Sequence, residues 1–395
     1  MRRSSLARRT ALAVAGLSLL AATPAHAAAP VDRAGVVDSA ARGALADAAG
    51  PQVDLDITMD LQSLRVSLIG YHSQPGDAPI TSYRATFGDG TAETSDSPVF
   101  SHNYTEPGEY QVSLTATDAE GRSDSATRTV SVLRWLSRGY LLARSNLRYL
   151  SPLTEGSGLQ AYRYGAEFLA KVDFADAGNG QVAMYWYGQP GYLTADVDGS
   201  GQVGTGAPNV LRGGRFAMIR NRDGSYSVRA GSGRYLSTSG SGGLVLANKT
   251  TISRFEQFQR VDAADGNRQF VARANGRYVN ASKTASPPLI ANATQGLVGQ
   301  TFDLVAFGGG QYALFARANN RFVTADASGT KPLVNTKVVP LTWERFVLVR
   351  NSDGSVSLRS VGNGRYVTAE SAGAKPLIAR AGRIGAWEQY SLRHR

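Results

Sequence analysis

Asn275-Gly276-Arg277-Tyr278-Val279 and Pro288-Leu289-Ile290-Ala291 decide the fold of this chain, because both segments recur. Gly364-Arg365-Tyr366-Val367 parallels the first segment, and Pro376-Leu377-Ile378-Ala379 parallels the second. An aromatic residue that follows a turn recurs at a spacing of 43 or 44 residues: Tyr149, Tyr192, Tyr235, Tyr278, Phe322 and Tyr366. Such a period indicates six copies of one structural unit.

A second aromatic residue recurs once in each copy, at Phe168, Phe216, Phe258, Phe302, Phe346 and Tyr390. Each unit holds roughly four short strands separated by Gly, Asn and Ser, and one unit alone cannot bury its apolar face. Three such units can close into a β-trefoil. Six can form two trefoils, a six-bladed propeller or an open array. The spacing alone leaves these architectures open.

The repeated motifs favour trefoils. The pattern G-R-Y-V-T-A, then P-L-I-A, then W-E-x-[FY], resembles the repeat of fascin-like β-trefoils over residues 134–395. This resemblance implies two trefoils, at 134–265 and 266–395. Fascins bundle actin inside eukaryotic cells with four trefoils, so actin is not an expected partner here. The Q-x-W triplet of ricin-type lectins is absent, so their sugar pockets are not transferred.

Residues 51–132 have a different pattern, in which apolar residues alternate with polar ones. Val53, Leu55 and Ile57 show it first, and Val112 and Leu114 show it later. Period-two alternation bounded by Gly, Pro and Asp predicts half-buried strands, and a segment of this length predicts a small Ig-like β-sandwich. The predicted fold class is therefore all-β, with a sandwich followed by two β-trefoils built from six repeats.

The sandwich segment also resembles a known family. Residues 83–91, which read Y-R-A-T-F-G-D-G-T, together with His102-Asn103-Tyr104, Pro107-Gly108-Glu109-Tyr110 and residues 112–118, resemble the signatures of a PKD (polycystic-kidney-disease-type) domain. The resemblance implies a spacer or adhesion module of secreted proteins. We interpret Asp89, between Gly88 and Gly90, as a turn residue that accepts backbone hydrogen bonds rather than as a calcium ligand. His102 is interpreted as structural.

The N-terminus predicts export. Arginines at 2, 3, 8 and 9 precede an apolar run over residues 11–22, and Ala25-His26-Ala27 supplies a cleavage site. This order is that of a secretory signal peptide, and the apolar run is too short to span a membrane. We therefore expect a signal peptide at 1–27, a linker at 28–50 and an extracellular protein without membrane insertion. The export route, Sec or twin-arginine, stays open.

The composition narrows the function. The chain has 395 residues, four His and no Cys, so disulfides and thiolate metal sites are excluded. Its formal charge of +11 is unevenly distributed. Residues 51–132 carry four Lys or Arg against twelve Asp or Glu, whereas residues 133–395 carry 32 against sixteen. The resulting positive field over the repeats attracts polyanions, and salt weakens that attraction.

The sequence predicts no catalytic, metal or cofactor site. Glu256, Glu344 and Glu388 recur at one position of the repeat, which favours a role in the fold. The only histidine beyond residue 133 is His394, near the end of the chain, so a serine triad is not expected. A calcium-type loop begins at Asp196, but its twelfth position is Ala207 rather than the closing Glu.

Candidate ligand-binding residues are aromatic residues that the other copies lack. Tyr185, Trp186, Tyr187, Tyr162 and Tyr164 are predicted to stack on a ligand, the alternative being that they fill a gap in a less regular first trefoil. The predicted function is non-catalytic binding or adhesion to a polysaccharide or an anionic cell-wall polymer. The alternatives are a protein-binding module, such as an inhibitor of an extracellular enzyme, and an unrecognised hydrolase.

Overall fold

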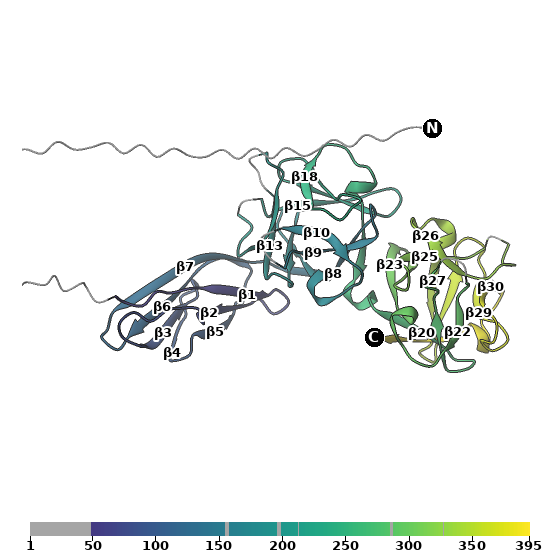
Figure 1. Cartoon of the computed structure of the whole chain (residues 1–395), viewed down its shortest axis with the longest axis horizontal. Helices are drawn as coiled ribbons and strands as arrows, with labels where there is room; N and C mark the ends of the chain where they lie inside the picture. The colour runs from purple at the N-terminus through teal and green to yellow at the C-terminus, as the bar shows by residue number, and fades with distance from the viewer. Residues whose placement is uncertain (1–48, 155–157, 196–198, 212, 285–286, 327) are drawn as a thin grey trace, which may run out of the picture. The chain divides into compact units, whose positions relative to one another are not determined.

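The computed structural model describes residues 49–395, apart from 155–157, 196–198, 212, 285–286 and 327. The predicted signal peptide, nearly all of the predicted linker and the start of the calcium-type loop lie outside the described residues. Ala48–Arg395 forms one compact unit. Within the described residues, regular structure consists of strands β1–β31 and short 3-10 helices, with no α-helix (Figure 1). The predicted fold class is confirmed: a β-sandwich precedes a β-trefoil architecture.

The sandwich contains two antiparallel sheets. One has the order β1-β2-β5 and the other the order β4-β3-β6-β7. Their strands are β1 (Asp56–Asp60), β2 (Arg65–Ile69), β3 (Ile80–Thr86), β4 (Ala92–Ser95), β5 (Val99–Asn103), β6 (Gly108–Asp118) and β7 (Ser123–Val132). The alternation along β6 has the predicted consequence, because Val112 and Leu114 are buried while Ser113 and Thr115 are more exposed.

The turn after β3 shows why its glycines are needed. Gly88 and Gly90 have φ angles of 79° and 94°, which favour glycine. A Cβ on Gly88 would also lie 2.6 Å from the carbonyl oxygen of Gln111. Asp89 accepts hydrogen bonds from the backbone N–H of Thr91, at 3.0 Å, and from its hydroxyl, at 2.6 Å. These contacts confirm the interpretation of Asp89 as a turn residue.

The six repeats form two twelve-stranded sheets, which we call the first and second repeat sheets. The first contains β8 (Trp135–Ala143), β9 (Arg148–Pro152), β10 (Leu159–Arg163), β11 (Val172–Asp176), β12 (Val182–Trp186), β13 (Gly191–Ala195), β14 (Val203–Ala207), β15 (Phe216–Arg220), β16 (Tyr226–Ala230), β17 (Tyr235–Ser237), β18 (Leu246–Lys249) and β19 (Phe258–Asp262). The second contains β20 (Arg268–Ala272), β21 (Arg277–Asn280), β22 (Ile290–Ala293), β23 (Phe302–Gly308), β24 (Gln311–Ala316), β25 (Arg321–Thr324), β26 (Val334–Lys337), β27 (Arg345–Arg350), β28 (Val356–Ser360), β29 (Tyr366–Ala369), β30 (Leu377–Ala381) and β31 (Tyr390–His394).

Each repeat sheet closes on itself. In the first, β19 pairs with β8, and in the second, β31 pairs with β20. The hairpins β9–β10, β13–β14 and β17–β18 extend from the closed strands of the first sheet, and β21–β22, β25–β26 and β29–β30 do so in the second. Two separately closed sheets exclude a single six-bladed ring.

The repeated Pro-Leu segment explains how the second repeat sheet acquires its threefold pattern. The backbone N–H of Leu289 donates to the carbonyl of Leu333, Leu333 donates to Leu377, and Leu377 donates back to Leu289, at 2.9, 2.8 and 2.8 Å. The three leucine side chains are buried in the same core. One segment, used three times, therefore closes a ring of hydrogen bonds between the three hairpins.

The second recurring aromatic residue fills the cores of both sheets. Phe216, Phe258, Phe302, Phe346 and Tyr390 are completely buried. Phe168, placed in this series from the sequence, does not belong to it, because it lies in a 3-10 helix (Phe168–Ala170) and is 59 % exposed. Val172, the first residue of β11, occupies the equivalent position instead.

Candidate functional site

The structure contradicts part of the predicted aromatic site. Trp186 is 0 % exposed and packs in the core of the first repeat sheet. Tyr185 is also buried, and its hydroxyl accepts a hydrogen bond of 2.9 Å from the backbone N–H of Met59 in the sandwich. A ligand cannot stack on either ring in this arrangement. The prediction that these two residues are exposed is therefore wrong, and the alternative that the rings fill space holds for them.

Tyr187 belongs to a partly buried polar cluster. Its hydroxyl donates to the Asp173 carboxylate at 2.7 Å, and the Arg138 guanidinium lies 4.8 Å from the centre of its ring. Arg138 also donates two hydrogen bonds to Asp173, at 2.7 and 2.8 Å. Burial, followed by the hydrogen bond and charge of Asp173, raises the pKa of Tyr187. These contacts give Tyr187 a structural role.

The two tyrosines of the first copy differ in exposure. Tyr164 is 64 % exposed, and the Arg148 guanidinium lies 3.5 Å from the centre of its ring. Tyr162 is partly buried, and its hydroxyl donates to the carbonyl of Pro152 at 3.3 Å. Of the five predicted residues, Tyr164 alone presents most of its side chain to solvent, and its ligand-binding role stays a prediction.

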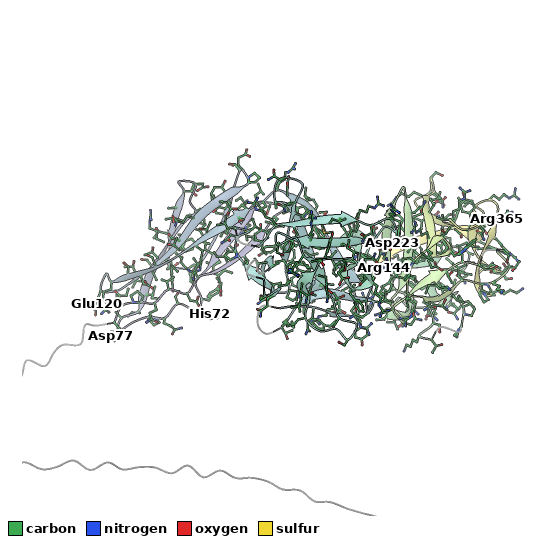
Figure 2. All side chains as sticks on the ribbon, turned by 90° about the horizontal axis from the view of Figure 1, so that it is seen from above. His72, Asp77, Glu120, Arg144, Asp223 and Arg365 are labelled. Carbon is green, nitrogen blue, oxygen red and sulfur yellow. The ribbon has the colours of Figure 1, made fainter. Side chains whose placement is uncertain are left out.

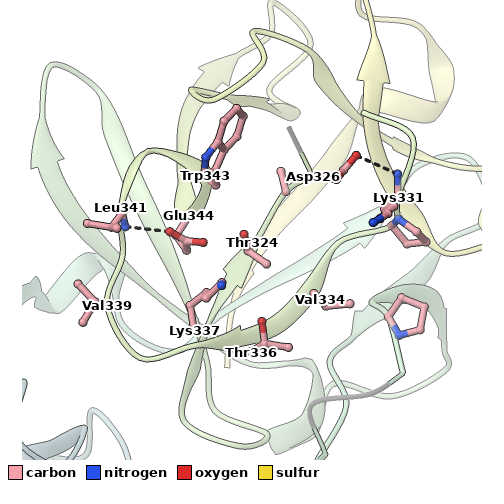
Figure 3. Close-up of a pocket in the computed structure, with 13 residues that line it drawn as sticks. Thr324, Asp326, Lys331, Val334, Thr336, Lys337, Val339, Leu341, Trp343 and Glu344 are labelled. Atoms are coloured by element: carbon pink, nitrogen blue, oxygen red, sulfur yellow. Dashed lines mark hydrogen bonds between the residues drawn. The ribbon is translucent and has the colours of Figure 1, made fainter. Parts of the chain in front are cut away.

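A pocket in the fifth copy combines an exposed aromatic residue with charged side chains. It has a volume of about 660 Å³ and lies between β25, β26 and the 3-10 helix Thr342–Glu344 (Figure 3). Trp343 lines it with 38 % of its side chain exposed. Asp326, Lys331 and Lys337 provide charged groups in the same lining. The pocket thus combines an accessible indole with both signs of charge.

Asp326 is held in its charged form. Its carboxylate accepts hydrogen bonds from the backbone N–H groups of Thr330 and Lys331, at 3.1 and 3.3 Å, and from the Ser328 hydroxyl. The hydrogen bond from Ser328, despite opposing desolvation, and those from the two backbone groups lower the pKa of Asp326 to about 2. The pocket therefore presents a fixed carboxylate at neutral pH.

Glu344 also lines the pocket, but its contacts are those of a turn. Its carboxylate accepts a 2.9 Å hydrogen bond from the backbone N–H of Leu341, and the residue is buried. Glu256 accepts from Ser253, and Glu388 accepts from Gly385, in the equivalent way. Gln300 does the same in the fourth copy. An amide can replace the carboxylate at this position, which confirms that the repeated acid supports the fold.

Equivalent pockets occur in two other copies. One is lined by Phe255 and has a volume of about 630 Å³, and the other is lined by Gly299 and has a volume of about 670 Å³. Each of these residues, like Trp343, directly precedes the buried Glu or Gln of its copy. The sequence signal for the pocket is therefore the residue before the repeated acid or amide, which varies between copies although the motif around it recurs.

A comparison with known protein families finds one match, which falls on the sandwich. A model of the family described as the PKD domain matches residues 49–132. Among solved structures, the PKD1 domain of Vibrio anguillarum Epp is 34 % identical, with 22 % of this chain and 96 % of that chain covered and a TM-score of 0.20. No curated protein matches the sequence.

Two solved structures are similar to one third of the chain. The designed threefold symmetric protein ThreeFoil is 22 % identical, with 32 % of this chain and 96 % of that chain covered and a TM-score of 0.30. The BEL β-trefoil is 16 % identical, with 32 % and 92 % covered and a TM-score of 0.29. The family match is confined to residues 49–132, which form the sandwich, and the rest of the chain consists of the two closed repeat sheets.

Two further observations limit the candidate sites. Within residues 49–395, as far as they are described, no three His, Asp or Glu side chains gather in a way that could hold a metal ion. The same described residues contain no helix that is long and apolar enough to cross a membrane.

Proposed function

We propose that this protein is a secreted, non-catalytic binding protein that attaches to a polysaccharide through the pocket around Trp343. The observation that carries the proposal is the accessible indole of Trp343 in a hollow that also presents Asp326 and Lys337. Aromatic faces pack on the apolar faces of sugar rings, while a few charged groups fix orientation through hydrogen bonds to hydroxyls.

The charge of the repeats favours an anionic polymer, such as a component of a cell wall. Residues 133–395 carry twice as many Lys and Arg as Asp and Glu. Lys331 and Lys337 bring two of these positive charges to the pocket itself. Because Asp326 brings a negative charge to the same pocket, the preference for an anionic polymer rests on the positive field of the repeats as a whole.

The repeat motifs support a finer assignment, in which residues 134–265 and 266–395 are two fascin-like β-trefoils. The ring of hydrogen bonds through Leu289, Leu333 and Leu377 is the arrangement expected of such a unit. Actin remains outside the proposal. Secretion is supported by the signal-peptide pattern of residues 1–27.

A second candidate function is protein binding, because apolar side chains extend the pocket outward. Leu341, which lines the pocket, is 56 % exposed, and Val338, which precedes the lining residue Val339 in the sequence, is 50 % exposed. Exposed apolar residues around a pocket are typical of protein interfaces as well. The two candidates differ in the partner that would cover these side chains.

Retention experiments separate these possibilities. Purified protein would be passed over insoluble neutral and acidic polysaccharides and over immobilised secreted proteins. We expect retention on a polysaccharide, with loss of retention in Trp343→Ala. Retention on proteins alone would favour the second candidate. Release of soluble sugar from any retained polysaccharide would contradict a non-catalytic role.

A further inference from the structure

One cross-strand pair recurs in all six copies and differs systematically between them. In each copy, the aromatic residue after the turn lies directly opposite a residue of the preceding strand. The six pairs are Leu142–Tyr149, Tyr185–Tyr192, Arg229–Tyr235, Val271–Tyr278, Phe315–Phe322 and Arg359–Tyr366. Because the repeat fixes the position of this pair, a difference in residue type between copies indicates a difference in the surroundings of the pair.

Three of the pairs are completely covered by another part of the molecule. Tyr185 and Tyr192 pack in one core with residues of the sandwich. Leu142–Tyr149 and Phe315–Phe322 pack together across the two repeat sheets. All six of these side chains are apolar or aromatic, which is what a covered position requires.

The other three tyrosines are only partly buried, and each lies beside an arginine. Arg229 and Arg359 are the cross-strand partners of Tyr235 and Tyr366. In the remaining copy, the Arg393 guanidinium lies 5.7 Å from the ring centre of Tyr278 and donates to its hydroxyl at 3.0 Å. In two of the three uncovered copies, an Arg–Tyr pair thus takes the place of an apolar pair, and in the fourth copy, where Val271 stays opposite Tyr278, the arginine comes from β31.

Two of these arginines, Arg359 and Arg393, are held by hydrogen bonds, and none of the three is neutralised by a carboxylate of the described residues. Arg359 donates from its Nε to the carbonyl of Gly364 at 2.9 Å, which leaves the terminal nitrogens of its guanidinium facing outward. No ion pair joins Arg229, Arg359 or Arg393 to a carboxylate of the described residues. Arg365 adds a further positive charge beside Tyr366, and Figure 2 shows it at the surface.

We infer that the three Arg–Tyr pairs bind the acidic groups of an anionic polysaccharide, outside the Trp343 pocket. A guanidinium fork matches carboxylate and sulfate oxygens two at a time, and the neighbouring ring offers an apolar face to a sugar. The inference rests on the proposed polysaccharide binding and names the acidic group as the feature that is recognised. The three pairs lie in the third, fourth and sixth copies, and a polymer that carries many acidic groups can supply one such group to each pair.

A charge-matched comparison tests the inference. The variant Arg229→Gln/Arg359→Gln/Arg393→Gln removes the three arginines, and Arg222→Gln/Arg254→Gln/Arg383→Gln removes three exposed arginines elsewhere in the repeats. Binding to polygalacturonate and to dextran sulfate would be measured by titration at low and physiological salt. We expect the first variant to bind at least about tenfold more weakly, with a shallower salt dependence, and the control to change little.

Several results would overturn the inference. An equal loss of binding in both triple variants would show that only the net charge matters, and not the three Arg–Tyr pairs. Failure of the wild type to bind either acidic polymer would also overturn it, even if a neutral polysaccharide were retained and the proposed function stood. Tighter binding to single-stranded DNA, lost in the same variant, would identify a different polyanion. A changed oligomeric state, measured by sedimentation, would make the pairs a contact between copies of the chain.

Discussion

Trp186 lies directly opposite Val172, across β12 and β11, and this pair reverses the sizes found in the other copies. There the large residue stands at the position of Val172 and a small one at that of Trp186. These pairs are Phe216–Ala230, Phe258–Ala143, Phe302–Ala316, Phe346–Ser360 and Tyr390–Ala272. Both Trp186 and Val172 are completely buried. In this copy the large side chain that fills the core therefore comes from β12, whereas in the other copies it comes from the strand equivalent to β11.

This exchange predicts a specific result from paired substitutions. Trp186→Ala should lower the free energy of unfolding by about 3–5 kcal/mol, because it leaves a cavity beside a small valine. Val172→Phe alone should also destabilise, because the space is already filled. The double variant Val172→Phe/Trp186→Ala restores the pair found in the sister copies and should recover a large part of the loss. Denaturant unfolding of the four proteins measures this, and a double variant no more stable than Trp186→Ala would contradict it.

The burial of Trp186 could not be predicted from the sequence, although the six repeats could. The period and the turn motifs were sufficient to predict six repeats, because those signals lie within each copy. The burial of Trp186 depends on its contact with Val172, which occupies a different position of the repeat. A comparison with Ala143, Ala272 and Ala316 alone suggests that its large ring is exposed. The sequence shows that the small Val172 compensates for the large Trp186 only when Val172, rather than Phe168, is aligned with the second recurring aromatic residue.

The candidate pocket was missed for a related reason. Trp343 belongs to a motif that recurs with Trp387, and such recurrence favours a role in the fold over a role in binding. The repeat does explain the buried Glu344, but it does not explain an indole that is more than one third exposed beside it. Recurrence in the sequence identifies residues that stabilise the fold. A residue that is available for binding can be recognised only when its solvent exposure is known.

Removing Trp343 should affect binding more than stability. A ring that stacks on a ligand contributes on the order of 1–3 kcal/mol, so Trp343→Ala should weaken polysaccharide binding by roughly 5- to 150-fold. Its melting temperature should stay close to that of the wild type, because part of the ring is already in water. Trp387→Ala is the matched control, since Trp387 precedes the equivalent Glu388 and is similarly exposed. Equal losses of binding in both variants would contradict a site specific to the fifth copy.

The repeated acid should tolerate an amide. Glu388 accepts hydrogen bonds from the Thr368 hydroxyl, at 2.7 Å, and from the backbone N–H of Gly385, at 2.8 Å. Glu388→Gln keeps an acceptor for Gly385, as Gln300 does for Leu297, and should cost less than about 1 kcal/mol. Glu388→Ala leaves buried donors unpaired and should cost about 1–3 kcal/mol. Thermal unfolding compares the two, and equal losses would show that the negative charge itself is required.

The sandwich should lose stability in acid through Asp89. Partial burial disfavours its charged form, but hydrogen bonds from the side chain and backbone of Thr91 and from His102 outweigh this effect and lower the pKa of Asp89 to about 2. Because the folded pKa lies below the ordinary value of 3.8, the charged carboxylate stabilises the fold above that value. This contribution is lost as the pH falls from about 4 toward 2.

Asp89→Asn should therefore reduce the stability of the sandwich at neutral pH and flatten its dependence on pH in that acidic range. The asparagine cannot replace the charge that His102 contacts at 2.6 Å, although its oxygen can still accept from Thr91. Glu93→Gln, an exposed substitution on β4, is the control for loss of one carboxylate. Urea unfolding followed at several values of pH between 2 and 7 gives both slopes. If Asp89→Asn and Glu93→Gln change with pH in the same way, the stabilisation does not come from the hydrogen bonds of Asp89, and the turn holds its geometry through Gly88 and Gly90 alone.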